Sequence, residues 1–441
     1  MHQPGIDGTA IRVTSRPKLW MAGLAAATMS LLVVLPTMTA SAATVDRWSG
    51  ADRYATAAAI SSNSVTAPAP VVFVATGTAF PDALAGGPAA ASLGGPVLLV
   101  SQTTIPATTA AELTRLTPAK IVILGGTSSV STAVETALAP YAPTVVRWAG
   151  ADRYETAATI SANTFSPGVA DVFVTTGATF PDALSGAAAA GFLHAPVLLV
   201  PGNAIPDATA AELTRLAPAQ ITVLGGTNAV TAGVFDALAA FTSGSVRRLS
   251  GADRYATSAA VAAAVFSTAT NAFIATGTDF PDALAGGPAA GAAAGPILLS
   301  QTACVPDVIA DQLDRLAPTT VTLLGGTNAL GAGVAALTRC SQFTPPPPPA
   351  ALFCAASMSN PTPAQQTNDI VNVTTLPAAA IQAAAHYKTT TTTHTGTADA
   401  SGVGAIEFQI ANATVGFTVQ VNVTVSLAGK TAGCSTSFTT S

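Results

Sequence analysis

Charged residues are scarce in this chain of 441 residues, and basic residues are scarcer than acidic ones. Asp, Glu, Lys and Arg make up 9% of the sequence, with 17 Lys and Arg against 22 Asp and Glu. Proteins that bind nucleic acid carry a basic surface or stripe, so the net charge of −5 argues against a nucleic-acid partner. Residues 1–42 hold three of the basic residues and one acidic residue, which leaves 14 against 21 and a net charge of −7.

The sequence also lacks the residue patterns of the common catalytic and metal sites. Beyond residue 42 it has three His, none in an HExxH motif or at paired metal-ligand spacing. It has no G-x-S-x-G or GxxxxGK[ST] motif, and its four Cys show no CxxC spacing. We therefore expect no catalytic residue, no metal and no cofactor. A catalytic pair of carboxylates can occur without a recognisable sequence motif, so we keep an enzyme as an alternative interpretation.

Only one long apolar run is present, from Leu19 to Leu35. A basic segment precedes it and the triplet Ala40-Ser41-Ala42 follows, which is typical of a secretory signal peptide over residues 1–42. An uncleaved membrane anchor is the alternative, but Gly, Thr, Ser and Pro interrupt the run. No later stretch offers the roughly 20 apolar residues that span a membrane. We expect a secreted protein with no membrane partner after cleavage.

The sequence instead contains one module that is repeated three times. The segment RWSGADRYAT at 47–56 returns with small changes at 147–156 and 248–257, an interval of 100 and then 101 residues. Two further blocks keep this period: TGTAFPDALAGG, TGATFPDALSGA and TGTDFPDALAGG at 76–87, 176–187 and 276–287, and LGGT at 124–127, 224–227 and 324–327. Linked weak sites make later contacts intramolecular, so three equivalent units favour multivalent attachment to something repetitive.

Within a module, signals for helices and strands alternate. In the first module Asp52 is placed to cap a helix from Arg53 to about Asn63, and Pro81 and Asp82 open another. Continuously apolar strands that alternate with helices predict a parallel sheet covered on both faces. We expect a small three-layer α/β fold in each module. The other elements expected in the first are strands at 71–75, 97–100, 121–124 and 145–148 and helices at 106–116 and 130–139.

The blocks R-x-x-G-A-D-R-Y-x-T, F-P-D-A-L and L-G-G, in fixed order and in three copies, resemble the type-2 putative cell-wall-binding repeat family of Gram-positive bacterial surface proteins. The resemblance covers repeats at 45–143, 144–244 and 245–343. It implies modules packed as a pseudo-threefold trimer that hold a secreted protein non-covalently to an anionic cell-wall polysaccharide. The departures are Leu249 in place of Trp, Ala187 in place of the second Gly of a Gly-Gly pair, and Ala195 in place of Gly.

The repeated polar residues are the candidates for ligand binding. Arg is suited to bidentate capture of carboxylate or phosphate, and free N–H groups at helix N-termini favour anions. The purely structural interpretation makes the first Asp a helix cap, the Arg an intermodule ion pair and the Tyr a core residue. The candidates are Asp52, Arg53, Tyr54, Asp152, Arg153, Tyr154, Asp253, Arg254, Tyr255, Asp82, Asp182 and Asp282. The glycines of LGGT are interpreted as turn residues.

The composition changes after the third repeat. Five prolines at 345–349 lie in a linker over 344–350, and residues 351–441 are rich in Thr, Asn and Val. Alternating runs at 370–374, 406–410 and 417–427 predict an all-β, immunoglobulin-like sandwich. This domain is either a spacer or the binding surface for an unknown partner. An adhesin or surface-assembly protein, whose modules contact other proteins, is the alternative function; an enzyme of wall metabolism is less favoured.

The four cysteines fall in pairs on either side of the proline-rich linker. Export favours disulfides, and four Cys allow three connectivities. Cys304 and Cys340 lie in the third repeat, while Cys354 and Cys434 bracket the C-terminal domain. Crossed pairing would join two domains across the linker, so we expect bridges 304–340 and 354–434.

Overall fold

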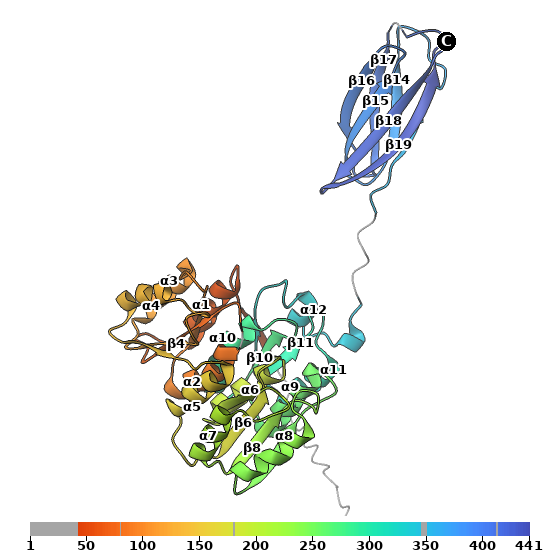
Figure 1. Cartoon of the computed structure of the whole chain (residues 1–441). Coiled ribbons are helices and arrows are strands. Elements are labelled where there is room, and N and C mark those ends of the chain that lie inside the picture. The colour runs from red at the N-terminus through yellow and green to blue at the C-terminus, as the bar shows by residue number, and fades with distance from the viewer. Residues whose placement is uncertain (1–42, 80, 180, 345–350, 412) are drawn as a thin grey trace, which may run out of the picture. The chain divides into compact units, whose positions relative to one another are not determined.

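The computed structural model describes residues 43–79, 81–179, 181–344, 351–411 and 413–441 (Figure 1). The expected signal peptide, residues 1–42, and residues 345–350 of the proline-rich linker lie outside these ranges. The chain divides after Phe343 into two compact units, which we call the repeat unit and the C-terminal unit. No helix in the described ranges is long and apolar enough to cross a membrane.

The repeat unit contains three parallel four-stranded sheets with the same strand order. Residues of each strand alternate between two cores: in the first sheet Phe73 and Ala75 face a core shared by all three repeats, whereas Val72 and Val74 face a core of the first repeat alone. Burial of both faces explains why the strands are continuously apolar. The sheets are β3 (Val97–Val100), β2 (Val72–Thr76), β4 (Ile121–Leu124) and β5 (Val145–Trp148); β7 (Val197–Val200), β6 (Asp171–Thr176), β8 (Gln220–Leu224) and β9 (Ser245–Leu249); and β11 (Ile297–Ser300), β10 (Asn271–Thr276), β12 (Thr320–Leu324) and β1 (Thr44–Trp48).

Helices cover both faces of each sheet, as the alternation in the sequence predicts. In the first repeat Ile60 of α1 enters the shared core, while Leu113 and Leu116 of α3 lie in the separate one. The α/β three-layer expectation is confirmed. The helices are α1 (Arg53–Ser64), α2 (Pro81–Leu93), α3 (Ala107–Leu116) and α4 (Thr132–Leu138); α5 (Arg153–Ala162), α6 (Pro181–Phe192), α7 (Asp207–Leu216) and α8 (Ala232–Ala237); and α9 (Arg254–Val265), α10 (Pro281–Ala292), α11 (Asp307–Leu316) and α12 (Ala332–Ala335), with short 3₁₀ turns at Ala139–Tyr141, Leu238–Phe241 and Cys340–Gln342.

Each sheet is completed by the strand that opens the next sequence repeat. Strand β5 pairs with β4 of the first repeat, and β9 pairs with β8 of the second. Strand β1 pairs with β12, so that Trp48 lies opposite Leu324 and the first repeat closes onto the third. The sheets are therefore one strand out of phase with the sequence repeats. The GADRY segment crosses from the last strand of one sheet to the helix that covers the next.

The three repeats meet at helices α2, α6 and α10, which pack pairwise against one another at the centre of the repeat unit (Figure 1). This is the pseudo-threefold arrangement that the family resemblance implied. Small residues let the backbones approach closely, in two layers that each hold two Gly and one Ala. The layers are Gly87, Ala187 and Gly287, and Ala91, Gly191 and Gly291. Ala187, a departure from the Gly-Gly pattern, supplies the one methyl group of its layer.

Two of the glycines of α10, Gly287 and Gly291, differ in the space beside them, which gives a matched test of this packing. A Cβ on Gly291 would lie 3.1 Å from backbone atoms of α6, whereas a Cβ on Gly287 would meet only the Ala187 methyl at 3.7 Å. We expect Gly291→Ala to lower the free energy of unfolding by about 1–3 kcal/mol through overpacking. Gly287→Ala, a better helix former without a clash, is expected to be neutral or to raise it by up to ~1 kcal/mol. Urea denaturation of both variants checks this; equal effects would contradict the close approach.

The C-terminal unit consists of two antiparallel sheets whose inward residues form one core. Alternate burial along β14 and β18 places Val371 and Val373 in the same core as Val421 and Val423. The all-β expectation is confirmed; the immunoglobulin-like assignment stays a prediction. The sheets are β13 (Ala355–Met358), β14 (Thr367–Thr374) and β17 (Val403–Ile410), and β16 (Thr391–Thr397), β15 (Ala380–His386), β18 (Thr418–Leu427) and β19 (Lys430–Thr439).

Both expected disulfides are present. Cys304 is bonded to Cys340 within the repeat unit, and Cys354 to Cys434 within the C-terminal unit. Neither bridge crosses from one unit to the other, so the pairing inferred from the domain boundaries is confirmed.

Candidate functional site

The Asp of each GADRY segment caps the helix that follows it. Its carboxylate accepts hydrogen bonds from first-turn backbone N–H groups, which otherwise have no partner. Asp52 accepts from Ala55 at 2.8 Å and Asp253 from Ala256 at 2.8 Å. The Thr of the same block holds the loop before the helix in place, since the Gly251 N–H donates to Thr257 Oγ1 at 3.1 Å. Asp152 caps its helix in the same way.

The Tyr of each segment points inward. Tyr54, Tyr154 and Tyr255 are partly buried and pack against the shared core. A Cβ on Gly77 would lie 2.7 Å from Cε1 of Tyr54, so the glycine at the end of β2 makes room for this ring. Burial raises the pKa of Tyr255. These rings pack against the shared core, and their part in ligand binding stays a prediction.

The Arg of each segment lies across the end of the neighbouring strand. Its Nη1 donates to the carbonyl of the Gly that follows the strand: Arg53 to Gly77 at 2.6 Å, and Arg153 and Arg254 to Gly177 and Gly277. This bond uses one N–H group of each guanidinium. Arg has five such donors in a planar fork.

The second group of candidate carboxylates opens the central helices α2, α6 and α10. Each lies against the first Gly of LGGT; a Cβ on Gly125 would be 2.0 Å from Asp82 Oδ2, and Gly125 has φ +92°, so only glycine fits. Ser129 Oγ donates to Asp82 Oδ2 at 3.1 Å. The carboxylates of Asp182 and Asp282 lie in the same way against Gly225 and Gly325.

Each of these carboxylates faces the Arg of the next repeat, not of its own. The charge of Arg153 acts on Asp82, that of Arg254 on Asp182 and that of Arg53 on Asp282. Burial raises the pKa of all three Asp residues, and the facing Arg only partly offsets it. For Asp282 burial and the negative charge of Asp279 raise the pKa to about 6.

The three repeated blocks therefore converge at three equivalent places between repeats. We define site I by Asp82, the turn at 125–129 and Arg153; site II by Asp182, the turn at 225–229 and Arg254; and site III by Asp282, the turn at 325–329 and Arg53. Site II contains an open pocket of about 580 Å³ lined by Ala178, Thr179, Pro181, Asp182, Gly226, Thr227, Asn228, Ala229, Gly251, Ala252, Asp253, Arg254 and Thr257.

The turn of site II presents backbone donors to this pocket. Ala229 and Val230 donate back to the Gly226 carbonyl, which winds the turn like the start of a helix. No described residue accepts a hydrogen bond from the N–H groups of Gly226, Thr227 or Asn228. Successive free N–H groups form an anion-binding concavity. Within the described ranges, no group of three or more His, Cys, Asp and Glu is placed to hold a metal ion.

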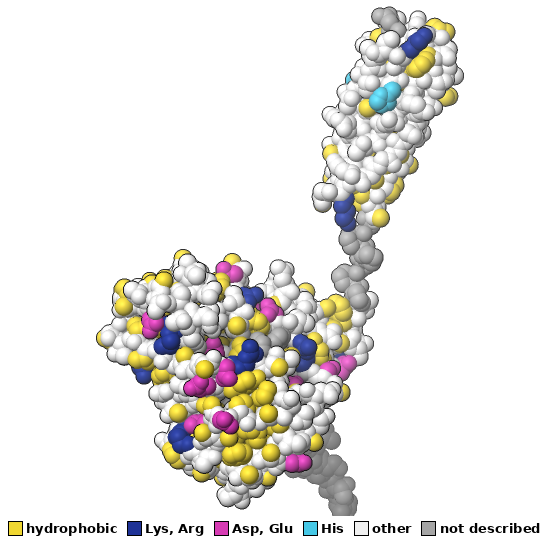
Figure 2. All heavy atoms as spheres, in the orientation of Figure 1, with side chains coloured by type: hydrophobic (Ala, Val, Ile, Leu, Met, Phe, Trp, Pro, Cys, Tyr) yellow, Lys and Arg dark blue, Asp and Glu magenta, His cyan; other side chains and the backbone are white. Residues whose placement is uncertain are grey.

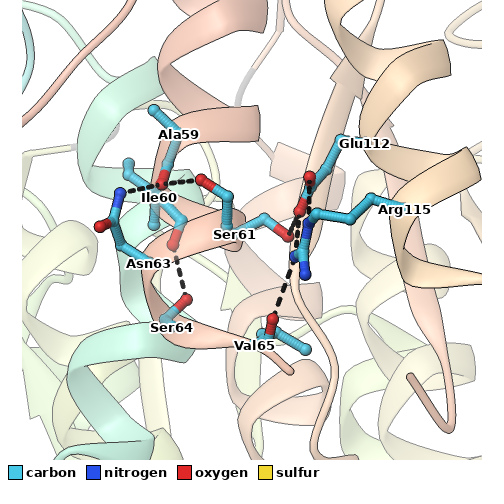
Figure 3. Close-up of polar contacts among 9 residues, drawn as sticks. Ala59, Ile60, Ser61, Asn63, Ser64, Val65, Glu112 and Arg115 are labelled. Atoms are coloured by element: carbon cyan, nitrogen blue, oxygen red, sulfur yellow. Dashed lines mark hydrogen bonds and ion pairs between the residues drawn. The ribbon is translucent and has the colours of Figure 1, made fainter. Parts of the chain in front are cut away.

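Two other tripled Arg series are bound within the protein. Arg47, Arg147 and Arg248 donate to the carbonyls of Gly325, Gly125 and Gly225. Arg115 pairs with the buried carboxylate of Glu112, with Nε to Oε2 at 2.7 Å and Nη2 to Oε1 at 2.6 Å, and Glu112 also accepts from Ser61 (Figure 3). Arg215 repeats this pair. These series stabilise the fold, which the sequence pattern alone did not distinguish from ligand binding.

The face of the repeat unit shown in Figure 2 has basic and acidic side chains next to each other, without a patch of one sign.

Comparison with known proteins agrees with this repeat architecture. The family model described as Cell wall binding domain 2 matches residues 47–135, 147–235 and 248–335. The chain belongs to the Cell wall binding domain 2 family. Each match begins at the strand that completes the sheet of the neighbouring repeat, so the family's sequence unit is one strand out of phase with the sheets here as well.

Two curated relatives match this chain over part of their own length. The chain is 30% identical over 292 residues to the amidase enhancer of Bacillus subtilis (strain 168), covering 66% of this chain and 40% of that protein. It is 26% identical over 258 residues to the N-acetylmuramoyl-L-alanine amidase LytC of the same organism, covering 58% and 50%. The chain thus spans half or less of the length of these relatives.

Two solved structures show the same fold. Cwp6 from Clostridium difficile matches with a TM-score of 0.63 and 24% identity, covering 70% of this chain and 50% of that chain. Cwp8 from the same organism matches with a TM-score of 0.62 and 26% identity, covering 69% and 53%.

Proposed function

We propose that this chain anchors itself non-covalently to an anionic polymer of the cell wall through the sites between its repeats. The observation that carries the proposal is site II, where Arg254 of one repeat and three free N–H groups of the preceding repeat line one pocket. Arg and backbone donors together suit a phosphate or carboxylate group. Family membership supports the cell wall as the place of binding.

The remaining parts of the proposal concern what is anchored. Residues 1–42 would direct secretion, and the C-terminal unit would be displayed at the cell surface, as a spacer or toward a partner that we do not assign. We propose binding without catalysis for the repeat unit. The amidase activity in the name of one relative belongs to that protein, of which this chain matches 50%.

The test is sedimentation of the purified protein, residues 43–441, with protein-free walls of a Gram-positive bacterium. One arm uses intact walls and the other uses walls stripped of acidic polymers. We expect retention on intact walls, loss of retention on stripped walls, and weaker retention as salt rises from about 0.05 to 0.5 M because salt screens exposed charges. Equal retention on stripped walls would contradict the anionic ligand and favour protein or peptidoglycan contacts. Release of soluble wall fragments would favour an enzyme.

A further inference from the structure

The three sites are equivalent in fold but not in charge. The block that follows the second strand of each repeat reads TGTAF, TGATF and TGTDF, so that Ala79, Thr179 and Asp279 hold the same position. In site II this position lines the pocket, since Thr179 is one of its wall residues. In site III the same position carries a carboxylate.

The Asp279 carboxylate lies where an anionic ligand would meet the arginine. Its Oδ2 is 3.6 Å from Arg53 Nη2, and both side chains are substantially exposed at 53% and 36%. The Arg53 guanidinium is also 5.9 Å from the ring centroid of Phe280, the neighbour of Asp279. The Phe280 N–H donates to Asp279 Oδ1 at 2.9 Å, which holds the carboxylate toward the site.

Site III thus holds two facing carboxylates for one arginine, because Asp282 lies there as well. Sites I and II have one such carboxylate each, Asp82 and Asp182. Asp253 also lines site II, but it is a helix-capping residue whose carboxylate accepts from the Ala256 N–H. Site I has a repeat-specific acid in Glu155, but this side chain accepts a hydrogen bond from the Ala151 N–H within its own loop at 2.8 Å. Among the described residues, neither Arg153 nor Arg254 forms an ion pair.

From this geometry we infer that the Asp279 carboxylate pairs with Arg53 in place of an anionic group of the ligand, and so prevents the wall polymer from binding at site III. This inference rests on the proposed function. The chain then binds through sites I and II only. A like charge placed where the ligand's charge would lie opposes binding, whereas the exposed pair itself contributes little to stability. Asp279 is therefore a specificity-determining residue, because it determines how many of the three sites bind the polymer.

The experiment places Asp279→Asn in the Arg153→Ala/Arg254→Ala background, in which only site III could bind. Asn keeps an oxygen that can accept from the Phe280 N–H while it removes the charge. On intact protein-free walls we expect this background to be retained no better than a variant that also carries Arg53→Ala. Adding Asp279→Asn is expected to restore retention by about tenfold, and Arg53→Ala to abolish the gain. Asp236→Asn, which removes an exposed acid on α8, is the control for net charge and should restore nothing.

The outcomes separate this inference from the proposed function. If the parent protein binds intact walls and Arg53→Ala reduces retention as much as Arg153→Ala does, site III binds the polymer. The inference is then wrong, but the proposed anchoring function is not. If Asp236→Asn restores as much as Asp279→Asn, the gain is a net-charge effect and the inference is again wrong. If the parent protein does not bind walls that carry acidic polymers, the proposed function itself is wrong.

Discussion

Replacing Arg153 and Arg254 together by Ala is expected to reduce retention on intact walls by about a hundredfold or more, while either replacement alone reduces it much less. Two sites joined in one rigid unit make the second contact intramolecular, so losing one leaves the other and losing both removes the avidity. Each Arg donates one hydrogen bond to a strand-end carbonyl. Melting curves recorded beside the sedimentation assay separate this loss from unfolding.

Lys388→Ala/Lys430→Ala is the matched control for charge. It changes the net charge by the same amount but lies in the C-terminal unit. We expect this variant to be retained like the parent protein. Equal losses in the single and double Arg variants would contradict multivalent binding, and an equal loss in the Lys control would point to non-specific attraction.

Removing the Cys354–Cys434 disulfide, as Cys354→Ser/Cys434→Ser, is expected to destabilise the C-terminal unit by about 4.5 kcal/mol in the chain-entropy model. The bridge closes a loop with a sequence separation of 80. The core of this unit is a single cluster that is smaller than the core shared by the three repeats, so less buried apolar surface offsets the loss. Calorimetry should show its transition at a lower temperature and the transition of the repeat unit unchanged.

The second disulfide is the internal control. Cys304→Ser/Cys340→Ser opens a loop with a separation of 36 and is expected to cost the repeat unit about 3.8 kcal/mol. In this variant the unfolding transition of the C-terminal unit should stay at the same temperature. A single shared transition that moves in both variants would show that the two units unfold together, contrary to the division after Phe343.

Much of the local structure could be predicted because it depends on neighbours in the sequence. Asp52 caps α1 as expected, the strands at 97–100 and 121–124 have the expected bounds, and α3 begins one residue late. Prediction was weaker in the C-terminal unit. β15 reads AIQAAAH and β19 reads KTAGCSTSFT, and neither has the β-branched run that marks β18, so their strand structure depends on pairing with β18.

The candidate residues could be predicted, but their grouping could not. The sequence places Asp82 in the same repeat as Arg53, whereas the structure sets it against Arg153. It gives the Arg115 series the same tripled spacing as the Arg53 series, although Arg115 is engaged by a buried carboxylate. The sequence shows that Asp279 replaces the Ala79 and Thr179 of the other two repeats. Nothing nearby in the sequence indicates that it faces an arginine more than 200 residues away.

By itself, the sequence determined the threefold repeat, the order of helices and strands, the helix caps and the disulfide pairs, because each depends on local periodicity, on capping chemistry or on domain boundaries. Only the tertiary structure decided which repeat completes which sheet. The exchange of β5 and β9 and the closure of β1 onto β12 depend on packing between near-identical modules, whose sequences match equally well in any register of repeats. Sites I to III exist only because of that exchange, which brings an arginine from one repeat to the carboxylate and free N–H groups of another.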